Sequence, residues 1–75
     1  MLDDRLTDKE KLEVLYILLE NKAAYECMNL KWAHKNKTGV NKDHHEYAYF
    51  LDELKSRGLA EYAKGRGEFV TYRII

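Results

Sequence analysis

Residues 51–73 decide the fold, and they read LDELKSRG followed by LAEYAKGRGEFVTYR. The first part is typical of a helix that ends at Gly58, since glycine after a basic residue is a common helix C-terminus. Residues 59–63 and 68–75 then have the composition of two β-strands. Between them, Gly65-Arg66-Gly67 supplies residues that adopt positive φ angles, which a tight hairpin turn needs. The stretch therefore predicts a helix that passes directly into a β-hairpin.

A first helix is predicted from Asp8 to Asn21. Thr7 and Glu10 have the spacing of a capping box, in which each side chain bonds the backbone N–H of the other residue. Apolar residues then recur at intervals of three and four, which is the helical period. The expected inward stripe comprises Leu12, Leu15, Leu18 and Leu19, widened by Val14 and Ile17.

Two more helices are predicted, over residues 24–36 and 42–57. Asn29 is a candidate interruption of the former, and Asn41 is the expected N-cap of the latter. On the hairpin, the uncharged face is expected to pack on the helices, which leaves Phe69 and Arg73 exposed. That inward face comprises Val70, Tyr72 and Ile74, and the aromatic side chains expected in the core are Trp32, Tyr47, Phe50, Tyr62 and Tyr72.

Length and composition limit the chain to a single domain, residues 1–75. It has 13 basic and 13 acidic residues, so its formal net charge is zero. Proteins that bind nucleic acids are usually basic, and binding by this chain would therefore need a local basic patch.

Cys27 is the single cysteine, so no internal disulfide can form, which fits a reducing compartment. The longest apolar run, residues 14–19, is far shorter than the ~20 residues of a membrane span. The start of the chain, MLDD, has no basic region of the kind found in signal peptides. We therefore expect a cytoplasmic protein that has no membrane partner.

Residues 39–73 resemble the winged helix-turn-helix superfamily, through Gly39-Val40-Asn41, the helix that ends LKSRG and the hairpin that follows. The resemblance implies an α+β fold of three helices with a C-terminal two-stranded hairpin wing. It also implies that the third helix enters the major groove of double-stranded DNA while the wing contacts the backbone. The hairpin tip is short for such a wing.

The resemblance brings residues 35–49 and 64–66 to one side of the domain. Residues 31–42 include four lysines and no acid, which makes that side basic. The DNA-binding residues that follow are Lys35, Lys37, Thr38 and Lys42 for phosphates, Lys64 and Arg66 on the wing, and Asp43, His44, His45, Glu46 and Tyr49 for base edges. A solvated polar face that binds nothing is the alternative interpretation of the same residues.

The leading functional hypothesis is a small DNA-binding transcriptional regulator of the kind found in phages and mobile elements. It would act as a homodimer by occlusion or recruitment, because one neutral module makes few phosphate contacts. The alternative is a non-catalytic protein–protein interaction module or inhibitor subunit on the same fold. Tyr25, Trp32, Tyr49 and Phe69 cannot all be buried in so small a domain, and those that are exposed would form the binding surface; for Trp32 the core is the preferred interpretation.

No enzymatic activity, cofactor or metal site is expected from the sequence. The pair His44-His45 suggests metal binding, but neighbouring residues of a helix point about 100° apart, which argues against chelation from one face. Cys27 is interpreted as a small buried apolar residue in preference to a reactive thiol. The chain has no glycine-rich phosphate loop followed by a helix.

Overall fold

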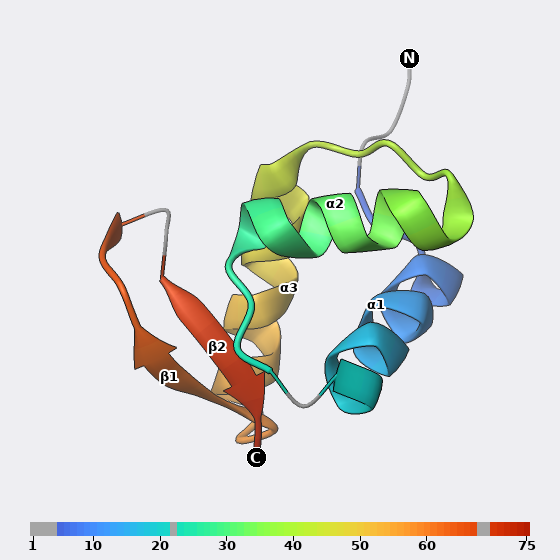
Figure 1. The fold of residues 1–75 in the computed structure, drawn as a ribbon. Helices are drawn as coiled ribbons and strands as arrows, with labels where there is room; N and C mark the ends of the chain where they lie inside the picture. Colours follow the sequence, from blue (N-terminus) through green and yellow to red (C-terminus); the bar gives the residue numbers. More distant parts are fainter. Residues whose placement is uncertain (1–4, 22, 68–69) are drawn as a thin grey trace.

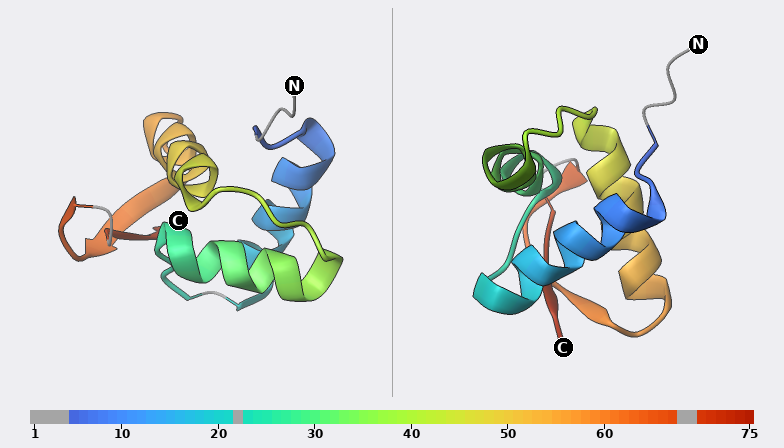
Figure 2. Two further views of the ribbon diagram at one scale, coloured as in Figure 1. Left: turned by 90° about the horizontal axis from the view of Figure 1, so that it is seen from above. Right: turned by 90° about the vertical axis from the view of Figure 1, so that its right-hand side faces the viewer.

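The computed structural model describes residues 5–21, 23–67 and 70–75. Three helices, α1 (Asp8–Asn21), α2 (Cys27–Thr38) and α3 (His44–Ser56), precede an antiparallel hairpin of β1 (Ala60–Lys64) and β2 (Thr71–Ile74) (Figure 1). The α+β class and the order of elements expected for a winged helix are confirmed. The helices enclose the core, and the hairpin lies beside α3 (Figure 2). Within the described ranges, no helix combines the length and apolar character needed to cross a bilayer.

Helix α1 has the predicted bounds, and its capping box is formed. The backbone N–H of Thr7 donates to Glu10 Oε1 at 2.8 Å, and the N–H of Glu10 donates to Thr7 Oγ1 at 3.2 Å. The inward face is narrower than predicted: Val14, Ile17 and Leu18 are buried. Leu12 is 58% exposed and Leu19 is exposed as well, because α1 packs on the domain along one side only.

Helix α2 begins three residues later than predicted, at Cys27 instead of residue 24. The cause is a β-bridge in which Tyr25 and Tyr72 exchange both backbone hydrogen bonds, each 2.9 Å long. This pairing holds the backbone extended, so the helix can start only after it. The helix is not interrupted at Asn29, and it ends at Gly39, whose φ of 80° suits a helix C-terminus.

The prediction of Asn41 as the N-cap of α3 was wrong. Asp43 has the extended backbone of a cap, and its carboxylate accepts from the N–H of His45 at 2.8 Å. The predicted end is confirmed: Gly58 has a φ of 75°, and the N–H of Leu59 donates to the carbonyl of Leu54 at 2.9 Å. This backbone geometry turns the chain directly into β1.

The hairpin pairs Ala60 with Ile74 and Tyr62 with Tyr72, and a bulge follows before Lys64. Gly65 and Gly67 have positive φ angles, as predicted for the turn. Tyr72 and Ile74 pack against the core and Arg73 is exposed, which confirms the predicted faces at these positions; Val70 is half-buried and Phe69 lies outside the described residues. Tyr62, expected in the core, is 51% exposed although it is paired with Tyr72, and its hydroxyl donates to the carbonyl of Gly65 at the hairpin tip.

The core combines residues of all three helices with a few flanking positions. The buried apolar residues are Leu6, Val14, Ile17, Leu18, Cys27, Leu30, Tyr47, Phe50, Leu51, Leu54 and Ala60. Cys27 is thus a buried apolar residue, as interpreted from the sequence. His34 is fully buried among them, whereas Trp32, expected in the core, is 47% exposed on the outer face of α2.

Candidate nucleic-acid interface

Helix α3 has one face in the core and one face in solvent. Tyr47, Leu51 and Leu54 point inward, whereas His45 and Tyr49 are exposed, Tyr49 to 62%. The start of α3 and the hairpin tip lie toward the same end of the molecule, and α2 crosses that half as well (Figure 1). The outer face of α3 is therefore available to a partner.

The hairpin tip is held by its own hydrogen bonds. The hydroxyl of Tyr62 donates to the carbonyl of Gly65 at 2.8 Å, and Thr71 Oγ1 bonds both the carbonyl and the N–H of Lys64, at 3.0 and 3.1 Å. Lys64 and Arg66 are exposed at this tip. Arg73, farther down the hairpin, is bonded to Glu61 at 2.9 Å, so its charge is already compensated.

Two lysines predicted to contact phosphates are directed to acidic residues of α1. Lys37 Nζ lies 3.3 Å from a carboxylate oxygen of Glu20. Lys42 Nζ lies 3.1 Å from Glu10 Oε1, and this pair has little exposed surface. Partial burial alone would raise the pKa of Glu10. The hydrogen bonds from the Thr7 backbone and from Lys42 outweigh burial, so the pKa of Glu10 is lowered.

Thr38, also predicted to contact phosphates, closes the end of α2. Its hydroxyl donates to the carbonyl of His34 at 2.9 Å and accepts from the N–H of Val40 at 3.3 Å. Its side chain therefore takes part in the turn between α2 and α3.

A basic aromatic surface on α2 was missed at the sequence level. Lys35 Nζ lies 4.7 Å and Lys31 Nζ 5.6 Å from the ring centroid of the exposed Trp32. Of these three residues only Lys35 was predicted to bind DNA, and Trp32 was interpreted as a core residue or as part of a protein-binding patch. The available signal was the helical spacing, since Lys35 follows Trp32 by three positions and Lys31 by four, and residues so spaced are neighbours on a helix surface.

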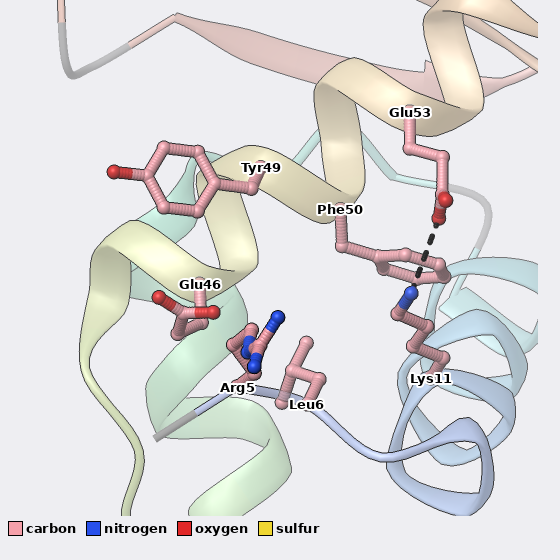
Figure 3. A pocket seen from close by; sticks show the side chains of 7 residues that line it. All are labelled: Arg5, Leu6, Lys11, Glu46, Tyr49, Phe50 and Glu53. Atoms are coloured by element: carbon pink, nitrogen blue, oxygen red, sulfur yellow. Dashed lines mark ion pairs between the residues drawn. The ribbon is translucent and has the colours of Figure 1, made fainter. Parts of the chain in front are cut away.

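Another flank of α3 borders a hollow of mixed charge. Glu46 and Glu53 line a hollow of about 200 Å³ together with Arg5, Leu6, Lys11, Tyr49 and Phe50 (Figure 3). Lys11 Nζ lies 3.6 Å from Glu53 Oε2. The hollow is smaller than the roughly 300–1,000 Å³ of typical small-molecule sites. Its two carboxylates are balanced by Arg5 and Lys11, so the hollow has no net charge.

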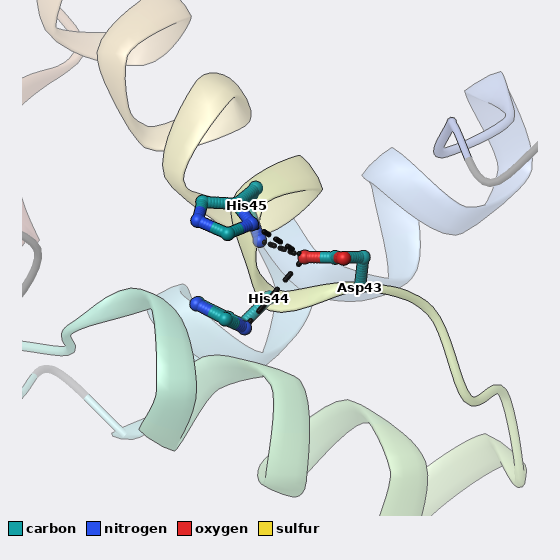
Figure 4. A group of neighbouring side chains, drawn as sticks. All are labelled: Asp43, His44 and His45. Carbon is teal, nitrogen blue, oxygen red and sulfur yellow. Dashed lines mark hydrogen bonds and ion pairs between the residues drawn. The ribbon is translucent and has the colours of Figure 1, made fainter.

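At the start of α3 the side chains of Asp43, His44 and His45 converge (Figure 4). Asp43 Oδ1 lies 2.8 Å from His45 Nδ1 and 3.6 Å from His44 Nδ1, and the two rings have centroids 4.1 Å apart. The pKa of Asp43 is lowered, mainly by the hydrogen bond from the backbone N–H of His45 and further by the two imidazoles. The expectation that the two histidines point apart was wrong, because both rings turn back toward the capping carboxylate.

The fold is similar to that of a solved structure of HOP2, from work on its DNA recognition and protein interaction domains and its homologous DNA pairing properties. The TM-score is 0.68 with 18% sequence identity, and the match covers 88% of this chain and 98% of that one. Identity at this level shows the winged-helix fold alone. The sequence matches no protein-family model, and no curated protein is significantly similar to it.

Proposed function

We propose that this chain is a non-catalytic module that binds double-stranded DNA, with α3 in the major groove and the hairpin tip against the backbone. The observation that carries the proposal is the outer face of α3, where His45 and Tyr49 are exposed. Neither side chain is needed for the core. Side chains on the outer face of such a helix can reach base edges in a major groove. The shared fold with the DNA recognition domain of HOP2 supports the same interpretation.

Phosphate contacts would come from cations on either side of α3. Lys64 and Arg66 at the hairpin tip are exposed, and Lys31 and Lys35 beside Trp32 are half-buried. Lys37 and Lys42 contribute less, because binding a phosphate would require breaking their ion pairs with α1. Four contacts correspond to a slope of about −3 to −4 in log K against log salt concentration.

Affinity would increase if two modules bound adjacent DNA sites as a homodimer. An apolar surface is present at the end of the molecule away from the hairpin tip. It comprises the exposed Leu12, Tyr16, Leu19, Leu59 and Ile75, and the backbone of Ile75 bonds the carbonyl of Leu59 at 3.1 Å. Pairing of two copies through this surface would leave both copies of α3 accessible. The resulting protein would regulate transcription by occupying an operator.

The same apolar surface favours one alternative, a protein-interaction module that binds a different protein and no DNA. A contiguous exposed apolar patch commonly marks a protein contact. The zero net charge is consistent with this alternative.

The deciding experiment is a fluorescence anisotropy titration of random-sequence duplex DNA with the purified chain at low and moderate salt. Binding that weakens steeply with salt supports the DNA function, and an operator selection would follow. If no binding occurs at low salt, the DNA function is wrong. Sedimentation equilibrium of the purified chain without DNA then tests the homodimer independently.

A further inference from the structure

Three potential metal-binding atoms are gathered at the first turn of α3, one each from Asp43, His44 and His45, all within 4.8 Å of one another. The three residues are consecutive, so their relative placement depends on the local backbone and little on the rest of the fold. Asp43 is held as the cap of the helix, and the rings of His44 and His45 lie side by side at 4.1 Å (Figure 4).

We propose that Asp43, His44 and His45 bind a divalent late-transition-metal ion, with Zn²⁺ as the physiological candidate. The ligands are two imidazole nitrogens and one carboxylate oxygen. Imidazole suits zinc, nickel and copper, whereas magnesium and calcium require a set of oxygen ligands. Two imidazoles and one carboxylate with an open fourth position also match a known type of zinc site.

The spacing of the donor atoms is close to what such a site requires. Zinc–ligand distances of about 2.0–2.2 Å in a tetrahedron place neighbouring ligand atoms roughly 3.3 Å apart. The two separations from Asp43 Oδ1, 2.8 Å to His45 Nδ1 and 3.6 Å to His44 Nδ1, lie on either side of that value. All three donor atoms lie within 4.8 Å of one another, and binding an ion would require side-chain rotation and would replace the hydrogen bond between His45 Nδ1 and Asp43 Oδ1. Asp43 Oδ1 also accepts the capping N–H of His45, so this one oxygen would serve both the cap and the ion.

The location moderates the affinity. The N-terminus of a helix carries partial positive charge, which opposes a cation, and the Asp43 carboxylate offsets part of that charge. The site is also accessible to solvent, since Asp43 and His45 are exposed. These features indicate a site that exchanges its ion readily. The fourth position would be available to water or, if the proposed DNA function is correct, to a phosphate oxygen.

The test is isothermal titration calorimetry of the full chain with ZnCl₂ in the absence of DNA, with Co²⁺ absorption spectroscopy as a second readout. One equivalent of Zn²⁺ should bind per chain, and Co²⁺ should give the visible bands of a site with nitrogen and oxygen ligands. Changes outside the ligand set often cost about 10–100-fold in affinity. Losing a ligand in His44→Gln, His45→Gln or Asp43→Asn should therefore weaken Zn²⁺ binding by at least about tenfold.

Glu46→Gln is the matched control, because it removes a carboxylate from the same helical turn outside the cluster, and it should bind Zn²⁺ like the unaltered chain. Circular dichroism tests whether each variant is folded. If Asp43→Asn or His44→Gln is unstable, the Zn²⁺ affinity of His45→Gln decides the test, because His45 is exposed. The proposal is overturned if no saturable one-to-one binding occurs, if the cluster variants bind as tightly as the control, or if Mg²⁺ binds equally well. Because DNA is absent, these outcomes are separate from success or failure of the DNA function.

Discussion

The hydroxyl of Tyr47 lies 2.6 Å from Nδ1 of His34, inside the core where the three helices meet. His34 Nε2 lies 3.0 Å from Glu13 Oε1. Because a carboxylate only accepts, Nε2 donates to it, and a neutral imidazole then accepts the tyrosine hydrogen at Nδ1. This chain of hydrogen bonds joins α3 to α2 and α2 to α1. Throughout the described part of the chain, no buried side-chain nitrogen or oxygen lacks a hydrogen-bond partner.

Tyr47→Phe should destabilise the fold by about 1–3 kcal/mol, because it leaves the buried Nδ1 of His34 without a partner. Urea unfolding measures the change. Tyr49→Phe is the matched control: Tyr49 lies on the exposed face of the same helix, and its substitution should alter stability by less than about 0.5 kcal/mol. Equal stability of the two variants would contradict the structural role of the network.

Stability should fall between about pH 10 and pH 12, because burial, aided by the carboxylates of Glu10 and Glu13, raises the pKa of Tyr47 to about 12. The folded chain keeps this proton where the unfolded chain has released it, so the unfolded state binds fewer protons and becomes favoured. Two pKa units correspond to about 2–3 kcal/mol.

Burial first and Asp52 second also raise the pKa of Tyr72, which acts in the same direction. The diagnostic measurement is therefore the difference in urea midpoint between pH 9 and pH 11, compared in the unaltered chain and in Tyr47→Phe. The variant should show the smaller difference, and parallel losses in both proteins would assign the effect to other groups.

Two adjacent leucines of α1 should respond differently to truncation. Leu18 is 1% exposed and Leu19 is 46% exposed. Leu18→Ala should cost about 2–5 kcal/mol of stability through the cavity it leaves. Leu19→Ala should change the stability of the monomer by less than about 1 kcal/mol. If the proposed homodimer forms, the latter change should weaken it, as sedimentation equilibrium of the folded variant would show.

Arg66 and Lys35 should contribute more to DNA binding than the paired Lys37. Arg66→Ala and Lys35→Ala should each reduce the salt slope of binding by about 1 and weaken binding to all sequences alike. Lys37→Ala should leave the slope unchanged, because the ammonium is bound to Glu20. Titrations of one duplex at several salt concentrations provide the comparison. The proposed phosphate surface is wrong if Lys37→Ala has the largest effect.

Gly58→Ala should destabilise the chain by about 1–2 kcal/mol, the typical cost of a left-handed backbone at a residue with a Cβ. The φ of Gly58 is 75°, and an added Cβ would meet no atom within 4 Å, so the cost is conformational and not steric. Gly58→Asn should lose less, since asparagine tolerates this region better. Thermal unfolding of the two variants compares them; a larger loss for asparagine would indicate a different cause.

Features set by neighbouring residues were predictable from the sequence. The capping box at Thr7 and Glu10, the helix end at Gly58 and the glycine turn of the hairpin each depend on a few adjacent positions. The late start of α2 was not predictable in this way, because it results from the pairing of Tyr25 with Tyr72, 47 positions later in the numbering. Asn41 and Asp43 are both good cap residues, and the path of the chain out of α2 decides between them.

The candidate interface shows the same limit. Charge and position identified Lys35, Lys64 and Arg66, which are on the surface, and the DNA contacts assigned to them remain predictions. The ion pairs of Lys37 and Lys42 with α1 were not visible, since their partners are distant in the sequence. Trp32 was misplaced because an aromatic residue at helical spacing fits either face of a helix, and only the packing of α2 determines which face is inward.

Because Tyr25 is bridged to Tyr72, insertions and deletions should be tolerated differently at the hairpin tip and near Tyr25. Extra residues inserted at Arg66 would lengthen the tip without disturbing any pairing in the body of the domain. Near Tyr25, by contrast, a single added or deleted residue would shift the register of the bridge and exchange the inward and outward sides of that segment. Natural variation or engineering of the reach of this domain should therefore be concentrated at the tip.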